Sequence, residues 1–183
     1  MTDAIPPARA DDEIAAFRMA GRPGGAPLTA DIAAFLEAGQ TVALAAGGRG
    51  DYPVCAMGIG CRVLCPAPGT LLIRVYLAAA ANAALLARVR AGGSVGATLT
   101  GVDHRSIQLK AAHGRLVPTG AEEIALLHRQ VAAHRDWLEI VGFPRDFAET
   151  LTCFADDDVA CIEFLPERVY VQTPGPGAGS RLE

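Results

Sequence analysis

The chain has 183 residues, of which 51% are apolar and 20% are charged, and this composition is typical of one globular domain that buries its own core. A net charge of −4 and an isoelectric point near 5.6 argue against general binding to nucleic acid or to anionic membranes. Residues 1–21 are too acidic and too rich in proline for a secretion signal, and no apolar run reaches the roughly 20 residues of a membrane-spanning helix. We therefore expect a cytoplasmic protein with no membrane or nucleic-acid partner.

The chain contains five cysteines, an odd number, and no Cys-x-x-Cys pair. Apolar residues flank them, which predicts buried, reduced thiols and no metal site. These residues are Cys55, Cys61, Cys65, Cys153 and Cys161.

The N-terminal part predicts two short helices. Residues 11–20 form the first, and the glycine- and proline-rich stretch 21–27 then breaks the chain. Thr29 is placed to cap a second helix that ends at Gly39. We expect residues 1–27 to be an N-terminal helix and linker, residues 28–173 the main domain, and residues 174–183 an irregular tail.

From Gln40 onward the apolar period changes to that of strands, starting with residues 41–46. In residues 54–63 one face is apolar and is expected to be core, whereas the other is almost without side chains. The first face holds Cys55, Met57, Ile59, Cys61 and Val63, and the second holds Ala56, Gly58, Gly60 and Arg62. Glycines inside a strand mark either a bulge or a close approach of something flat to the backbone.

The remaining elements follow in order. Strands are predicted at residues 70–77, 94–100 and 104–116, and at 159–172 with an interruption at Pro166, and helices at 78–91 and 120–134 with further helical pieces up to residue 151. Short strands joined by tight turns favour a mainly β, antiparallel α+β fold, closed or partly closed into a small barrel.

The strand at residues 104–116 carries the only lysine of the chain. Ser106, Gln108 and Lys110 alternate with the apolar Ile107 and Leu109. Such a face is either the solvated outside of a barrel or one wall of a pocket for an anionic cofactor. Tyr170 and Gln172 share a face of the last strand and have the same two interpretations.

The histidines give no catalytic or metal motif. His128 and His134 lie six residues apart on one predicted helix, so they cannot form an i, i+4 metal pair and are interpreted as partly exposed helix residues. His104 and His113 flank the predicted strand and are interpreted as turn residues, with a hydrogen bond from either one to a ligand as the alternative. Trp137 is expected to anchor the helical segment on the barrel.

Three features together resemble the pyridoxamine 5′-phosphate oxidase-like family, the FMN-binding split β-barrels. The strand ending at Arg62 is followed by a hairpin to "IRVYL" and a helix, "HRSIQLKAAHGRL" is similar to an Arg-polar-apolar strand of the family, and a late strand precedes "QTPG". The similarity covers residues 28–172. It implies a homodimeric, antiparallel split β-barrel with FMN in a groove between the subunits.

The resemblance also implies the residues that bind the cofactor. Arg62 corresponds to an arginine near the flavin phosphate, Arg105 and Ser106 to a pair beside the cofactor, and Gln108 and Lys110 continue that face. Gly60 would let the flavin ring approach the strand. The remaining candidates are Arg74 and Tyr76 on the preceding hairpin and Asn82 at the start of the helix.

The function that the resemblance implies is a flavin-dependent oxidoreductase acting on a small molecule, with no catalytic residue assigned because the flavin carries the chemistry. Residues 78–81 are all alanine where the family has basic and hydroxyl groups. This departure favours the alternative, a non-enzymatic module of the same fold that binds or senses a flavin or haem.

Overall fold

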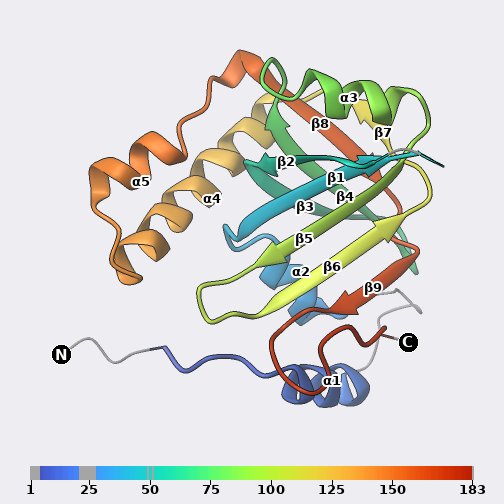
Figure 1. The fold of residues 1–183 in the computed structure, drawn as a ribbon, viewed down its shortest axis with the longest axis vertical. Coiled ribbons are helices and arrows are strands. Elements are labelled where there is room, and N and C mark those ends of the chain that lie inside the picture. The colour runs from blue at the N-terminus through green and yellow to red at the C-terminus, as the bar shows by residue number, and fades with distance from the viewer. Residues whose placement is uncertain (1–4, 21–27, 49, 51, 183) are drawn as a thin grey trace.

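The computed structural model describes residues 5–20, 28–48, 50 and 52–182. Nine strands among them form two antiparallel sheets, with the order β2-β1-β5-β6-β9 in the first and β3-β4-β8-β7 in the second. The antiparallel α+β class predicted from the sequence is therefore confirmed, although the described helices and strands hold similar numbers of residues, so the fold is not mainly β (Figure 1). The strands are β1 (Thr41–Gly47), β2 (Val54–Gly58), β3 (Gly60–Ala67), β4 (Thr70–Ala78), β5 (Ser94–Thr100), β6 (Ser106–Ala111), β7 (Arg115–Val117), β8 (Val159–Phe164) and β9 (Arg168–Val171). The described helices are α1 (Ala10–Met19), α2 (Ala30–Leu36), α3 (Ala83–Arg90), α4 (Ala121–Ile140) and α5 (Arg145–Leu151), and a 3-10 helix covers Asp156–Asp158.

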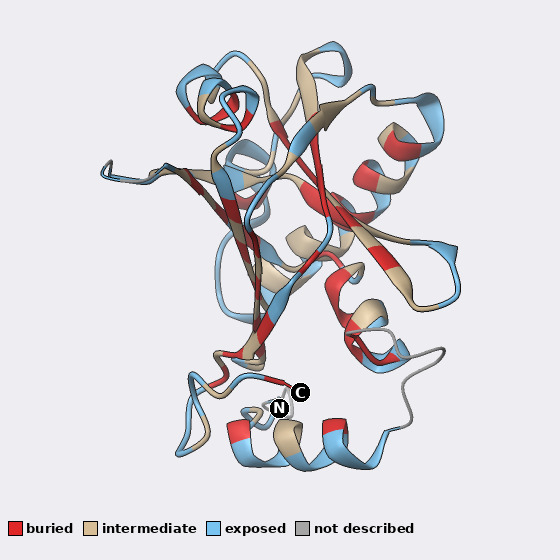
Figure 2. Ribbon diagram, turned by 90° about the vertical axis from the view of Figure 1, so that its right-hand side faces the viewer, coloured by how far each residue is buried: buried red, intermediate tan, exposed pale blue. Residues whose placement is uncertain are grey.

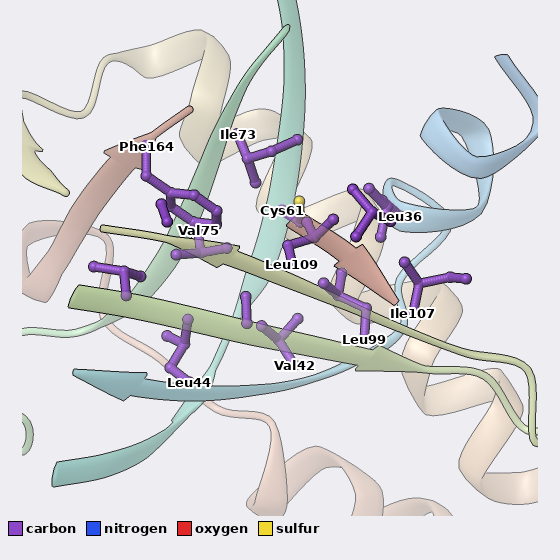
Figure 3. Packing of buried hydrophobic residues seen from close by; sticks show 14 of the residues in the cluster. Leu36, Val42, Leu44, Cys61, Ile73, Val75, Leu99, Ile107, Leu109 and Phe164 are labelled. Atoms are coloured by element: carbon purple, nitrogen blue, oxygen red, sulfur yellow. The ribbon is translucent and has the colours of Figure 1, made fainter. Parts of the chain in front are cut away.

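The core lies between the two sheets. Period-2 alternation turns Val42, Leu99 and Leu109 of the five-stranded sheet inward, where they meet Ile73 and Val75 of the four-stranded sheet. Figure 3 shows these side chains pointing toward one another, and Figure 2 shows that the buried residues follow the strands. This packing fixes which face of each strand points away from the core.

Two strands predicted as continuous are divided between the sheets. The predicted strand 54–63 breaks at Ile59, because β2 pairs with β1 whereas β3 pairs with β4. The predicted strand 159–172 divides near Pro166 into β8 and β9, which belong to different sheets. The break at Ile59 shifts which side chains of the strand point toward the core. The prediction that Cys55 and Met57 face the core is therefore wrong. Both are exposed, and Ala56 packs against the core instead.

The cysteines divide in the same way. Cys61 and Cys161 are buried as predicted, whereas Cys55, Cys65 and Cys153 are exposed. None of the five is in a disulfide bond.

The helices are distributed unevenly over the two sheets. Helix α4 packs on β3 and is one continuous helix rather than the separate pieces predicted, and α5 packs on α4. Helix α1 contacts β9, and the C-terminal segment bridges back to β9 through Tyr170 and Arg181. No helix crosses in front of β1, β5, β6 and β9 in Figure 1. The outer face of the five-stranded sheet is therefore open within the described part of the chain.

Within the described ranges, no helix combines the length and the apolar character that crossing a membrane requires. The predicted linker 21–27 lies outside those ranges.

Candidate functional site

A cavity of about 760 Å³ lies on the open face of the five-stranded sheet. Its floor is flat because small residues follow one another across neighbouring strands, with Ala43 and Ala45 on β1 and Gly96 on β5. A methyl group added to Gly96 would meet only the carbonyl oxygen of Leu109, at 3.9 Å. Around the floor lie Cys55, Met57, Pro53, Gly47, Ser94, Thr98, Gln108, Lys110 and Arg168. The floor has room for a planar molecule lying flat.

The polar groups of this cavity gather on β6 and β9. Lys110 and Arg168 are directly paired in the register of these strands, so their side chains start from adjacent positions on the same face. Neither has an ion pair with any described residue, although Lys110 Nζ lies 5.0 Å from the centroid of the Tyr170 ring. The described lining contains no carboxylate. Two cations with no counter-ion among the described residues, at one edge of a flat floor, have the charge to hold an anion.

Gln108 lies on the same face of β6 as Lys110, two residues before it and opposite Thr98 of β5. Its Nε2 donates to Thr98 Oγ1 at 3.2 Å, and its Oε1 accepts from Gln172 Nε2 at 3.3 Å. These bonds hold the amide in one orientation across β5, β6 and β9.

Arg62 and Arg74 lie elsewhere, on the outer face of the four-stranded sheet beneath α4. Arg62 Nη1 donates to Glu123 Oε1 at 3.1 Å, and Arg74 donates to the same oxygen at 2.7 Å and to Glu163 Oε2 at 2.9 Å. Arg115 also binds Glu163, so arginines and carboxylates alternate in one chain of ion pairs. Each guanidinium already has a carboxylate partner.

This network keeps its two carboxyls ionised. Burial acts to raise the pKa of Glu163, but hydrogen bonds from Arg115 and Arg74 outweigh it and leave that pKa below its ordinary value. Burial likewise acts to raise the pKa of Glu123, and backbone N–H donors together with Arg62 and Arg74 lower it. The network joins α4 to the four-stranded sheet.

Arg105, just before β6, also has carboxylate partners, which belong to α1 and α2. Its Nη2 donates to Asp31 Oδ2 at 2.6 Å, its Nε lies 2.6 Å from Glu13 Oε1, and its guanidinium stacks 4.5 Å from the centroid of the Phe35 ring. Arg105 thus ties α1 and α2 to the start of β6. It does not share the cavity of Gln108 and Lys110.

The other predicted residues have structural surroundings. Ser106 is buried and its hydroxyl lies 2.9 Å from that of Thr100, and Tyr76 is fully buried, which raises the pKa of its phenol. The space beside Gly60 is filled by Gln130 and Leu127 of α4, so this glycine permits helix packing.

Asn82 hydrogen-bonds to the last residue of β4. Its Nδ2 donates to the carbonyl oxygen of Ala78 at 2.8 Å just before α3. Of the nine predicted site residues, the structure therefore brings Gln108 and Lys110 together in one cavity and distributes the others over the four-stranded sheet, the start of β6 and the start of α3.

Sequence reasoning missed Arg168. The signal was present, because Arg168 precedes Tyr170 and Gln172 by two and four residues and alternation puts all three on one face of the last strand. What the sequence did not reveal is the pairing of β9 with β6, which sets Arg168 beside Lys110.

Comparison with known proteins gives neither a matching family model nor a matching curated protein. Among solved structures, HupZ from Group A Streptococcus has 11% identity and a TM-score of 0.47, with 84% of this chain and 98% of that chain covered. A putative pyridoxamine 5′-phosphate oxidase from Lactobacillus delbrueckii has 12% identity and a TM-score of 0.47, with 82% and 99% covered. The chain resembles the pyridoxamine 5′-phosphate oxidase-like proteins.

A third similar structure is HutZ, the haem storage protein from Vibrio cholerae, with 15% identity, a TM-score of 0.42, and 77% of this chain and 92% of that chain covered. At these identities, ligand and activity have to be argued from the residues of this chain.

Proposed function

We propose that the chain forms a homodimeric, split-barrel FMN-binding protein of the cytoplasm, whose cofactor lies on the open face of the five-stranded sheet and serves a redox reaction on a small molecule. The observation that carries this proposal is the pair Lys110 and Arg168 at the edge of a flat floor whose described lining contains no carboxylate. The free thiols of the chain fit a reducing compartment.

The residues of the cavity fit FMN in charge and in shape. A phosphate group with nearly two negative charges needs several donors, and the guanidinium of Arg168 offers a planar fork while Lys110 offers a compact charge. The floor of Ala43, Ala45 and Gly96 leaves room for the flat isoalloxazine ring. Gln108 presents an oriented amide near that floor for hydrogen bonds to the ring.

A second copy of the chain would complete the site. Met57 is 60% exposed on the open face and Cys55 is exposed beside it, so one copy leaves an apolar border in water. A two-fold contact through this face would bury the border and place a second wall over the floor. The cofactor would then lie between subunits and out of bulk water.

When bound, FMN supplies the hydride or electron transfer. The described lining of the cavity holds no histidine or carboxylate, so the residues of this chain bind the anion, orient the ring and exclude water. Lys110 and Arg168 would hold the phosphate, and the oriented amide of Gln108 would hydrogen-bond to the part of the molecule that lies next to them.

The test is retention of FMN. The purified protein is incubated with FMN and desalted, its visible absorption is recorded, and the dissociation constant is measured for Lys110→Ala and Arg168→Ala. Each substitution is expected to weaken binding by about 1.5–3 kcal/mol, the range for a hydrogen bond to a charged group.

Two kinds of control define the outcome. Arg129→Ala removes an exposed arginine of α4 that only binds a carbonyl of its own helix, and it should leave FMN affinity unchanged. Arg62→Ala tests the assignment that the family resemblance implies. Loss of FMN binding in Arg62→Ala, with full binding in Lys110→Ala and Arg168→Ala, would contradict the proposed site.

The second candidate is a non-enzymatic module that binds a flavin or haem on the same face. The lack of a histidine or carboxylate in the described lining favours it, because binding needs no such acid or base. Stoichiometric binding of haem by the wild type, with no affinity for FMN, would favour this module. Binding of FMN together with substrate-dependent reoxidation of the reduced protein would favour the enzyme.

A further inference from the structure

A second cavity, of about 450 Å³, lies between the helical pair α4–α5 and the adjoining ends of β1, β2 and β4. Its volume is within the range of cavities that hold small organic molecules. The described lining is Gln40, Thr41, Val42, Met57, Gly58, Ile59, Ala78, Val131, His134, Leu138, Phe143, Leu151, Thr152, Cys153 and Phe154. No lysine, arginine, aspartate or glutamate is among them.

His134 offers this cavity one defined hydrogen-bond acceptor. Its Nδ1 lies 3.1 Å from the carbonyl oxygen of Gly39, and since a carbonyl only accepts, Nδ1 carries the proton. Nε2 is then the unprotonated nitrogen, and it has no hydrogen bond to a described residue. Burial lowers the pKa of His134, and the bond to Gly39 raises it by less, so the ring is neutral at neutral pH.

The rim of the cavity is apolar and exposed. Met57 is 60%, Leu151 59% and Phe143 45% accessible, and the Phe143 ring stacks on that of Phe147 at 5.0 Å between centroids. An apolar molecule bound in the cavity would cover these side chains. Each Å² of apolar surface removed from water stabilises the complex by about 25 cal/mol. The rim therefore favours an apolar occupant.

We propose that this cavity binds a small, uncharged aromatic molecule with a single hydrogen-bond donor, which it presents to Nε2 of His134. The molecule is uncharged because a buried charge needs a partner and the described lining offers none. It carries a donor because the unprotonated Nε2 of His134 is an acceptor; the other polar side chains of the described lining are those of Gln40, Thr41, Thr152 and Cys153. The cavity is distinct from the one that holds Lys110, although Met57 borders both.

The test compares two probes of the same shape, 2-naphthol and naphthalene, by titration calorimetry and by fluorescence. The wild type is expected to bind 2-naphthol about two- to tenfold more tightly than naphthalene, the factor that one net hydrogen bond gives. His134→Phe keeps a flat ring and removes the acceptor, so it should bind both probes equally. His113→Phe is the matched control and should keep the preference, because His113 is exposed, its Nδ1 also lies 3.0 Å from a carbonyl oxygen, that of Gly92, and it does not line this cavity.

Three further results bear on the proposal. Ala78→Leu narrows the cavity and leaves the bond between His134 and Gly39 in place, so it should weaken both probes at least tenfold and serves if His134→Phe does not fold by circular dichroism. Lys110→Ala should leave naphthol binding unchanged, which separates this proposal from the FMN site. Equal binding of the two probes by the wild type, binding of neither, or an unaltered preference in His134→Phe would overturn it.

Discussion

At the residue scale, Gln130 shows how one buried side chain joins three elements. Cys61 donates its backbone N–H to Gln130 Oε1 at 2.9 Å, and Nε2 donates to the carbonyl oxygens of Cys61 at 2.7 Å and Glu37 at 2.9 Å. Gln130→Ala would leave buried backbone groups of β3 unpaired, and we expect it to lower the free energy of unfolding by about 2–4 kcal/mol. Urea denaturation measures the loss, and a change below about 0.5 kcal/mol, as expected for the exposed Arg129→Ala, would refute this role.

The same substitution, glycine to alanine, is expected to have different effects on stability at two positions of the sheets. At Gly60 an added methyl group collides with Gln130 and Leu127, so Gly60→Ala should destabilise the fold. At Gly96 the same methyl group meets nothing closer than 3.9 Å, so Gly96→Ala should fold normally and weaken FMN binding by raising the floor of the cavity. Melting temperatures and FMN titrations of both variants check the pair. Similar stability losses in the two variants would contradict it.

At the element scale, the ion pairs beneath α4 predict an acid-sensitive fold. The folded-state pKa of Glu163 lies below its ordinary value of 4.5, so its stabilisation is complete above that pH and is lost as the pH falls through the folded pKa. Glu163→Gln should lower stability at pH 7 by roughly 3 kcal/mol and flatten the decline of the melting temperature below pH 5. Asp157→Asn, at an exposed carboxylate outside the network, is the control and should change neither. If the melting temperature of Glu163→Gln declined below pH 5 as it does in the wild type, the ion pairs beneath α4 would not be the cause of the acid sensitivity.

The positions of the helices and strands were largely predictable from the sequence, but which face of each strand points toward the core was not. The predicted strand at residues 94–100 coincides with β5, because alternating apolar residues between glycines define a strand locally. Alternation does not tell which face is the core, so Cys55 and Met57 were assigned to the wrong side of a strand that breaks at Ile59. The partners of Arg62 and Arg105 were equally hidden, since Glu123 and Glu13 are distant in sequence.

At the scale of the whole molecule, the open sheet face predicts a dimer. Ala45→Arg places a long cation at the centre of that face and should convert the dimer to a monomer with its fold intact. Light scattering coupled to gel filtration measures the mass. Arg129→Ala is the matched surface control, and a wild-type protein that runs as a monomer at all concentrations would contradict the shared groove.

The central claim is that FMN lies on the outer face of the five-stranded sheet. Hydrogen exchange measured by mass spectrometry, with and without FMN, locates the ligand directly. We predict slower exchange in β5, β6 and β9, around Gly96, Lys110 and Arg168, and no change in β3. Protection confined to β3 and β4, around Arg62 and Arg74, with β6 and β9 unaffected, would contradict the claim.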